Sequence, residues 1–150
     1  KAQFSDVAIP QPKATPGGPD GEVPGIDQFS QPTAYFAELF KTIGFNTDQH
    51  NLKSTTCLQT VANIAEYMNK NPNLYIFVEG HCDQRASEAY NLSLGTRRAN
   101  TVRTLLVKRG VNPNRIYTIS FGKEMPADPR NNAEAWEKNR RVEFKTFEKF

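Results

Sequence analysis

The chain has 150 residues, of which 37% are hydrophobic, and its formal net charge is +3. This length allows one ordinary hydrophobic core with an appendage, and no hydrophobic run approaches the ~20 residues that a membrane-spanning helix needs. The mild positive charge suits an anionic polymer. It is not clustered as on a nucleic-acid-binding face, so we expect no nucleic-acid partner.

The N-terminal part differs in composition from the rest. Residues 1–36 hold six of the ten prolines and four of the nine glycines. A segment of this kind buries too little apolar surface to offset the entropy lost on ordering. We therefore expect a flexible Pro/Gly-rich tether over residues 1–36 and a folded domain over residues 37–150. Residues 1–30 should be dispensable for folding.

The first half of the domain predicts a strand, a helix and a second strand. The first strand is expected over residues 41–45. A capping-box pattern at Thr56–Gln59 begins the helix, and Asn71 followed by proline ends it. The apolar run over residues 74–78 is short and uninterrupted, as in a central strand buried on both faces.

The second half continues the alternation. A helix that contains Arg98 should stop at Gly110, because glycine favours helix C-termini. A strand is expected over residues 116–121, then a loop with a short helical segment over residues 133–138, and a last strand over residues 142–145. The order predicts an α+β, two-layer sandwich with the helices on one face of a mixed four-stranded sheet (β-α-β-α-β-β).

The most informative feature is the run Val78–Asp83, followed fifteen residues after Asp83 by Arg98. At about 3.6 residues per turn, Arg98 lies on the apolar stripe of its helix and Arg97 lies on the solvated face. An unpaired buried guanidinium is costly, so Arg98 needs an anionic partner, and Asp83 is the natural candidate. The spacing alone leaves open a structural salt bridge and a pair that grips a zwitterionic ligand.

Several ordered motifs within residues 45–147 resemble one known family. They are Val78–Asp83, Tyr90–Asn100, Ile119–Pro126 and Asn139–Glu143. They are similar to the OmpA C-terminal-like domain and, within that family, to the peptidoglycan-associated lipoproteins. The resemblance implies the same fold and non-covalent binding of the diaminopimelate in the peptidoglycan peptide stem. It implies that Asp83 holds the ammonium of the ligand and that Arg98 holds its carboxylate, which favours the ligand-binding interpretation.

The resemblance also assigns supporting positions. Asn91 and Arg140 match positions that line the peptide site, where the amide supplies hydrogen bonds and the guanidinium supplies charge. Without the resemblance, Asn91 is equally well explained as a turn or helix-cap residue. His81 is more often structural, but its place beside Asp83 makes it a candidate for the rim of the site.

Three positions depart from the family pattern. Asn46 stands where the family has aspartate after the first-strand phenylalanine, which alters a contact of the first loop with the ligand. Cys82 replaces a small residue or threonine and should leave the site intact. Ala86 replaces glycine, and a left-handed backbone would strain it, so we expect the loop over residues 84–88 to take another path.

Cysteines and histidines invite a zinc hypothesis, since Cys57, Cys82, His50 and His81 are possible ligands. Adjacent strand residues such as His81 and Cys82 point to opposite faces, however, and no C-x-x-C or H-x-x-x-H spacing is present. We expect no metal and no cofactor, and no catalytic cysteine, because Cys82 lacks an orienting third group. The two cysteines are expected to be free thiols, with a disulfide as the alternative.

These expectations describe a non-enzymatic tether between the outer membrane and the cell wall. The domain would bind peptidoglycan from the periplasmic face of the outer membrane, held there by a lipid anchor that precedes Lys1. The resemblance also implies a TolB-like propeller as partner in a Tol-Pal-type system. The alternatives are the same domain in an OmpA-type porin tail or a flagellar stator and, less favoured, an enzyme acting on the wall.

Overall fold

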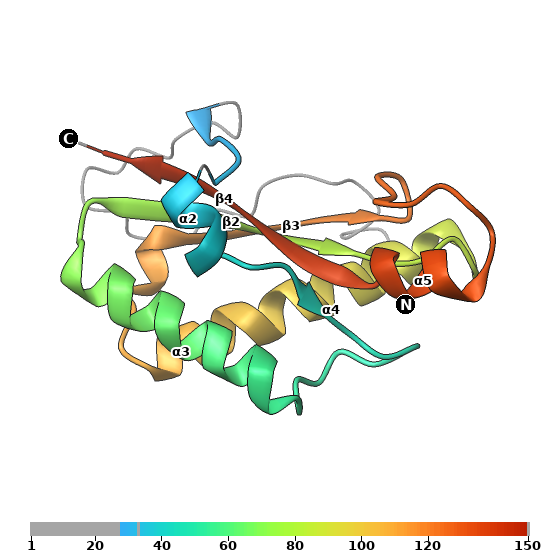
Figure 1. Cartoon of the computed structure of the whole chain (residues 1–150), viewed down its shortest axis with the longest axis horizontal. Helices are drawn as coiled ribbons and strands as arrows, with labels where there is room; N and C mark the ends of the chain where they lie inside the picture. The colour runs from blue at the N-terminus through green and yellow to red at the C-terminus, as the bar shows by residue number, and fades with distance from the viewer. Residues whose placement is uncertain (1–27, 33, 150) are drawn as a thin grey trace.

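The computed structural model describes residues 28–32 and 34–149 (Figure 1). Four strands form a single sheet in the order β1-β4-β2-β3. They are β1 (Ile43–Gly44), β2 (Leu74–His81), β3 (Ile116–Gly122) and β4 (Arg141–Glu148). β2 pairs with β3 in parallel and with β4 antiparallel, and β1 pairs antiparallel with β4. The predicted mixed four-stranded sheet is confirmed.

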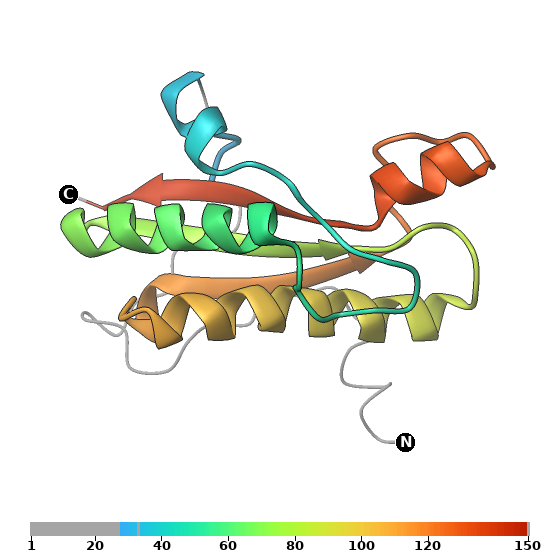
Figure 2. The ribbon, with the colours of Figure 1, turned by 60° about the horizontal axis from the view of Figure 1, so that its bottom comes forward.

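Two long helices, α3 (Thr55–Lys70) and α4 (Glu88–Lys108), lie along one face of this sheet (Figure 2). Ser54 is the N-cap of α3 and accepts a hydrogen bond from the Cys57 N–H (3.4 Å), so the helix begins before the predicted capping box. Ser87 caps α4 in the same way through the Tyr90 N–H (3.1 Å). The predicted two-layer α+β architecture is therefore confirmed.

Shorter elements complete the domain. They are α2 (Ala34–Leu39), the 3-10 turn η2 (Pro113–Arg115) and α5 (Ala133–Asn139). The sequence predicted α5 within the long loop but not α2, and the first strand is shorter than predicted. In Figure 1, α5 lies beyond the end of the sheet where β2 and β3 finish. None of the helices within the described ranges has the length and apolar character needed to cross a membrane.

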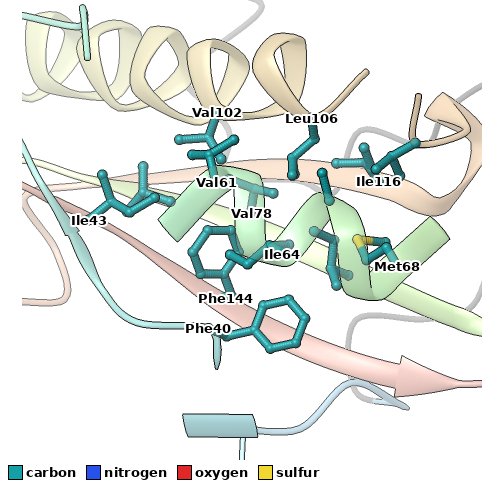
Figure 3. Packing of buried hydrophobic residues seen from close by; sticks show 14 of the residues in the cluster. Phe40, Ile43, Val61, Ile64, Met68, Val78, Val102, Leu106, Ile116 and Phe144 are labelled. Atoms are coloured by element: carbon teal, nitrogen blue, oxygen red, sulfur yellow. The ribbon is translucent and has the colours of Figure 1, made fainter. Parts of the chain in front are cut away.

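The main core fills the space between the sheet and the two long helices (Figure 3). Val61, Ile64 and Met68 of α3 meet Val102 and Leu106 of α4 there, all at most 1% exposed. Such burial is the dominant favourable contribution to folding.

The close approach of α4 to β2 depends on two glycines. A Cβ atom on Gly80 would collide with the backbone carbonyl of Gly95, and one on Gly95 would collide with the Ser120 hydroxyl. The contact places the Arg98 side chain, one turn further along α4, against the end of β2.

The other face of the sheet carries a second, aromatic cluster formed by Phe29, Tyr75, Phe77, Tyr117 and Ile119. The Phe29 ring meets the Phe77 ring edge-on at 4.6 Å. The neighbouring Ser30 joins Thr146 through two backbone hydrogen bonds of 2.9 Å.

This packing corrects the N-terminal boundary. Residues 1–27 of the expected tether lie outside the described residues, but Phe29 is only 6% exposed. The expectation that residues 1–30 are dispensable for folding therefore conflicts with the position of Phe29. The physical reason is that the second face of the sheet is apolar as well, and it needs a cover that its own strands do not supply.

Candidate functional site

The candidate site lies where β2 ends and the chain turns into α4. A cavity of about 190 Å³ opens there, lined by Thr47, Asp48, Cys82, Asp83, Arg85, Ala86, Asn91, Leu94 and Arg98. A wider hollow of about 660 Å³ shares Thr47 with it and is lined by Asn46 and Arg140 among other residues. Five of the six predicted site residues thus line one of two adjoining hollows; the sixth, His81, lines neither.

Arg98 has no exposed surface, which confirms its predicted place on the buried stripe of the helix. Its guanidinium donates to three backbone carbonyls, those of Gln49 (2.9 Å), His81 (2.9 Å) and Asn46 (3.0 Å). The predicted ion pair with Asp83 is wrong, because the ion pairs of Asp83 within the described residues are with Arg85 and Arg140. The loop after β1 folds over α4 and offers main-chain oxygens instead, and these carry no side-chain signature in the sequence.

The charge of Arg98 is consequently not matched by a carboxylate within the described residues. Burial lowers the pKa of its guanidinium, which remains charged because arginine starts so far above neutrality. These three hydrogen bonds use three of its five N–H groups, and the Cys82 thiol also interacts with the guanidinium. An anion in the adjoining cavity would balance the charge.

Asp83 is held instead by Arg85, a residue that the sequence analysis did not single out. Oδ1 of Asp83 accepts hydrogen bonds from the Arg85 backbone N–H (3.0 Å) and Nε (3.1 Å), and Oδ2 accepts one from Nη2 (2.8 Å). Burial raises the pKa of the Asp83 carboxyl, but the Arg85 hydrogen bonds and charge hold it below its ordinary value. Asp83 is therefore ionised. The Asp-x-Arg spacing was the signal that could have revealed this pair.

Arg140 stands on the other side of Asp83. Its Nη1 lies 3.6 Å from Asp83 Oδ2, and its Nε donates to the Phe45 carbonyl (2.9 Å). The guanidinium therefore bridges the residue that follows β1 and the acid of the site. Asn46 contributes its main-chain carbonyl to Arg98, so its departure from the family's aspartate leaves this contact unchanged.

Asn91 ties the loop before α4 in place. Its amide nitrogen donates to the carbonyls of Asp83 (3.3 Å) and Arg85 (2.6 Å). Its Oδ1 accepts no hydrogen bond from a described residue, and Asn91 lines the cavity. The two explanations left open by the sequence are thus compatible, since one end of the amide has a structural role and the other is available.

Ala86 takes the left-handed backbone conformation after all, with φ of 70°. The expectation that the loop would avoid this conformation is wrong. Lys123 Nζ donates to the Ala86 carbonyl (3.0 Å), and Asn91 holds the preceding Arg85 carbonyl. These contacts hold the turn despite the strain that a Cβ atom introduces at positive φ.

His81 points away from the site, so its assignment to the rim needs correction. Its ring stacks on Phe121 at 5.5 Å on the aromatic face of the sheet, and only its carbonyl reaches Arg98. The alternation of side chains along β2 places His81 on the same face as Glu79. The other explanation that the sequence offered, a structural histidine, describes its side chain better.

The group Glu79, His81 and Glu143 is the arrangement nearest to a metal site within the described residues, with ligand atoms within 4.8 Å of one another. Lys145 Nζ lies 2.8 Å from Glu79, and Arg141 bonds to Glu143. The two carboxylates are therefore already compensated by fixed cations that a metal ion would have to displace. We assign no metal to this group.

Both cysteines are free in the structure, Cys82 buried and Cys57 half-buried. The Cys82 thiol donates to the Asn91 carbonyl at 3.1 Å. Burial raises the pKa of this thiol to about 11, so it is protonated near neutral pH. A protonated thiol is neither a good nucleophile nor a good metal ligand.

A two-layer α+β domain with a charged pocket at one end of its sheet is the class that these observations define. The OmpA family model matches residues 44–140 of the chain. The chain belongs to the OmpA family.

The similar proteins have consistent names. The chain is 36% identical over 126 residues to a peptidoglycan-associated lipoprotein of Agrobacterium fabrum, covering 84% of this chain and 68% of that protein. A Rhizobium meliloti protein of the same name is 42% identical over 100 residues, or 67% of this chain and 56% of that protein.

Solved structures share the fold. The crystal structure of the peptidoglycan-associated lipoprotein from Burkholderia pseudomallei has a TM-score of 0.68 at 28% identity, covering 70% of this chain and 88% of that one. The C-terminal domain of Helicobacter pylori MotB has a TM-score of 0.66 at 27% identity, covering 73% and 85%.

Proposed function

We propose that this domain binds the peptide stem of peptidoglycan non-covalently and thereby tethers the outer membrane to the cell wall. The names of its relatives support peptidoglycan as the ligand. One observation carries the proposed site: a fully buried Arg98 without a carboxylate partner in the described part of the chain shares a cavity with the ionised Asp83. Diaminopimelate offers a matching pair of charges at its free end.

Each polar group has a defined task in this proposal. The guanidinium of Arg98 binds the carboxylate of diaminopimelate, and Asp83 faces its ammonium. Arg140 adds positive charge for the anionic stem, and Asn91 Oδ1 accepts a hydrogen bond from a stem amide. The function is binding rather than catalysis, in keeping with the family, and the Cys82 thiol that lines the cavity is held protonated.

The cellular setting follows from the relatives. The domain acts in the periplasm and belongs to a protein held in the outer membrane by a lipid anchor. We propose a TolB-like propeller as a second partner, on the family resemblance alone. The alternative, the same domain carried by another anchor, is supported by the similarity to the MotB domain.

Titration with a stem peptide that contains diaminopimelate tests the site. Asp83→Ala and Arg98→Lys should each lose about 2–5 kcal/mol of binding free energy, or roughly 30- to several-thousand-fold in affinity. The lysine variant fails because an ammonium does not reproduce the planar fork of arginine. Arg97→Ala is the matched control, since Arg97 is exposed on the same helix.

A melting curve for each variant shows whether the variant is still folded. If Asp83→Ala stays folded and binds as tightly as the unchanged protein, the site assignment is wrong. Measurable binding of purified muropeptides without turnover separates a tether from a wall-acting enzyme. A pull-down with insoluble peptidoglycan extends the test from the stem peptide to the polymer.

A further inference from the structure

Arg85 lies where the proposed ligand would have to bind. We propose that its guanidinium is a built-in occupant of the ammonium position at Asp83 and that a ligand's ammonium must displace it. This inference rests on the proposed function, and it makes Arg85 a specificity-determining residue of the same site. The ligand class is a zwitterionic amino-acid end that carries both an ammonium and a carboxylate.

The first support is that Asp83 has little acceptor capacity left. A carboxylate offers about four lone-pair positions, and three hydrogen bonds from Arg85 already use the two oxygens. Arg140 stands 3.6 Å from Oδ2, and the Asp83 side chain is only 9% exposed. An incoming ammonium with three donors therefore finds about one open lone-pair position at Asp83 unless a cation leaves.

The second support identifies which cation leaves. The Arg140 side chain is 13% exposed and is anchored to the Phe45 carbonyl. The Arg85 side chain is 40% exposed and lies 4.2 Å from the centre of the Trp136 ring. The indole N–H of Trp136 donates to Asn131 (3.1 Å), which orients the ring. The guanidinium thus keeps a cation–π partner that does not depend on Asp83.

The consequence concerns what the site selects. The carboxylate of the ligand meets an Arg98 without a carboxylate partner, whereas its ammonium only replaces an ion pair that already exists. The carboxylate therefore meets the less compensated of the two partners, and Arg85 reduces the contribution of the ammonium. Removing Arg85 should restore that contribution without touching the carboxylate position.

A comparison of two ligands across variants tests this directly. One stem peptide carries diaminopimelate and the other carries 2-aminopimelate, which keeps the distal carboxylate and lacks the distal ammonium. The ammonium preference is the dissociation constant of the 2-aminopimelate peptide divided by that of the diaminopimelate peptide. Arg85→Met should raise this ratio about two- to fivefold, the range expected for losing a competing, partly exposed ion pair. Arg85→Gln introduces a neutral side chain about as long as methionine, so it should change the ratio in the same direction.

Arg130 supplies a matched control. It binds Asp128 with the same Asp-x-Arg geometry, through its backbone N–H (3.1 Å), Nε (3.0 Å) and Nη2 (2.6 Å), but it lines neither hollow of the site. Arg130→Met should leave the ammonium preference unchanged.

The possible results separate this inference from the function on which it rests. A ratio that stays the same or falls in folded Arg85→Met and Arg85→Gln overturns the inference, because Arg85 would then brace Asp83 or contact the ligand itself. If the unchanged protein binds neither peptide, the proposed function fails first. Binding of both peptides with a ratio that rises only in the Arg85 variants supports both.

Discussion

Two buried arginines, Arg98 and Arg115, lie at opposite ends of β2 and are held in the same way. Arg98 donates to three backbone carbonyls around the end of the strand. Arg115 donates to three around its start, those of Asn71 (3.0 Å), Leu74 (2.7 Å) and Met68 (2.8 Å). Burial lowers the pKa of both guanidinium groups.

What differs is the surroundings. Arg98 lines a cavity that also contains an ionised carboxylate, whereas Arg115 joins the end of α3 to the start of β2 and lines neither hollow of the candidate site. A buried arginine with satisfied hydrogen bonds is therefore not by itself a sign of ligand binding. The informative feature is a cavity that the buried arginine lines together with an ionised carboxylate.

The largest expected effect separates the two arginines by affinity. Arg98→Met should weaken binding of the diaminopimelate stem peptide by about 2–5 kcal/mol, whereas Arg115→Met should bind as the unchanged protein does. Both variants leave backbone carbonyls without a donor, so each should also lose about 1–3 kcal/mol of stability. Calorimetric titration and melting curves measure the two quantities. An equal loss of affinity in both variants would remove the distinction.

A second effect concerns the aromatic face near the Arg115 end. A chain that begins at Gln31 lacks Phe29, so it should lose roughly the 1.5–3 kcal/mol that burying a large apolar side chain contributes. A chain that begins at Gln28 keeps Phe29 and is the control. Ligand affinity should be the same in both, because Phe29 packs on the face opposite α4. Equal melting temperatures would show that residues 28–30 are dispensable after all.

The pH dependence of ligand affinity tests how Asp83 is held at the end of β2 where Arg98 lies. Because the pKa of Asp83 lies below its ordinary value of 3.8, its contribution to stability is present above that value and is lost as pH falls through the lower, folded-state pKa. Affinity for the stem peptide should therefore stay nearly constant from pH 7 to about pH 4.5. In Arg85→Met the main group lowering this pKa is gone, so affinity should fall at a higher pH. An identical profile would contradict the role given to Arg85.

The smallest effect is the strain at Ala86. Replacing this residue by glycine removes the Cβ atom that is unfavourable at φ of 70°, and should raise stability by about 0.5–1 kcal/mol. Chemical denaturation gives this difference. Ala127→Gly, in a loop where no positive φ occurs, is the control and should not stabilise. A destabilised Ala86→Gly would mean that the loop gains more from reduced backbone freedom than it loses to strain.

Local patterns were sufficient for the architecture. Strand and helix order, the place of Arg98 on the buried stripe and the solvated place of Arg97 follow from spacings within a few residues, which the sequence displays directly. The Asp83–Arg85 pair is also local, two residues apart. The sequence nevertheless favoured Arg98 as the partner of Asp83, because a guanidinium on the buried stripe of a helix needs an anion more than an exposed loop arginine does.

By itself, then, the sequence determined the α+β fold, the burial of Arg98 and the closeness of Asp83, Asn91 and Arg98 at one end of the sheet. Only the tertiary structure decided which atoms satisfy Arg98, because the carbonyls of Asn46 and Gln49 come from a loop about fifty residues away and every residue type has a carbonyl. The docking of Phe29 was likewise decided at that level, since the apolar second face that it covers exists only once β2, β3 and β4 are paired.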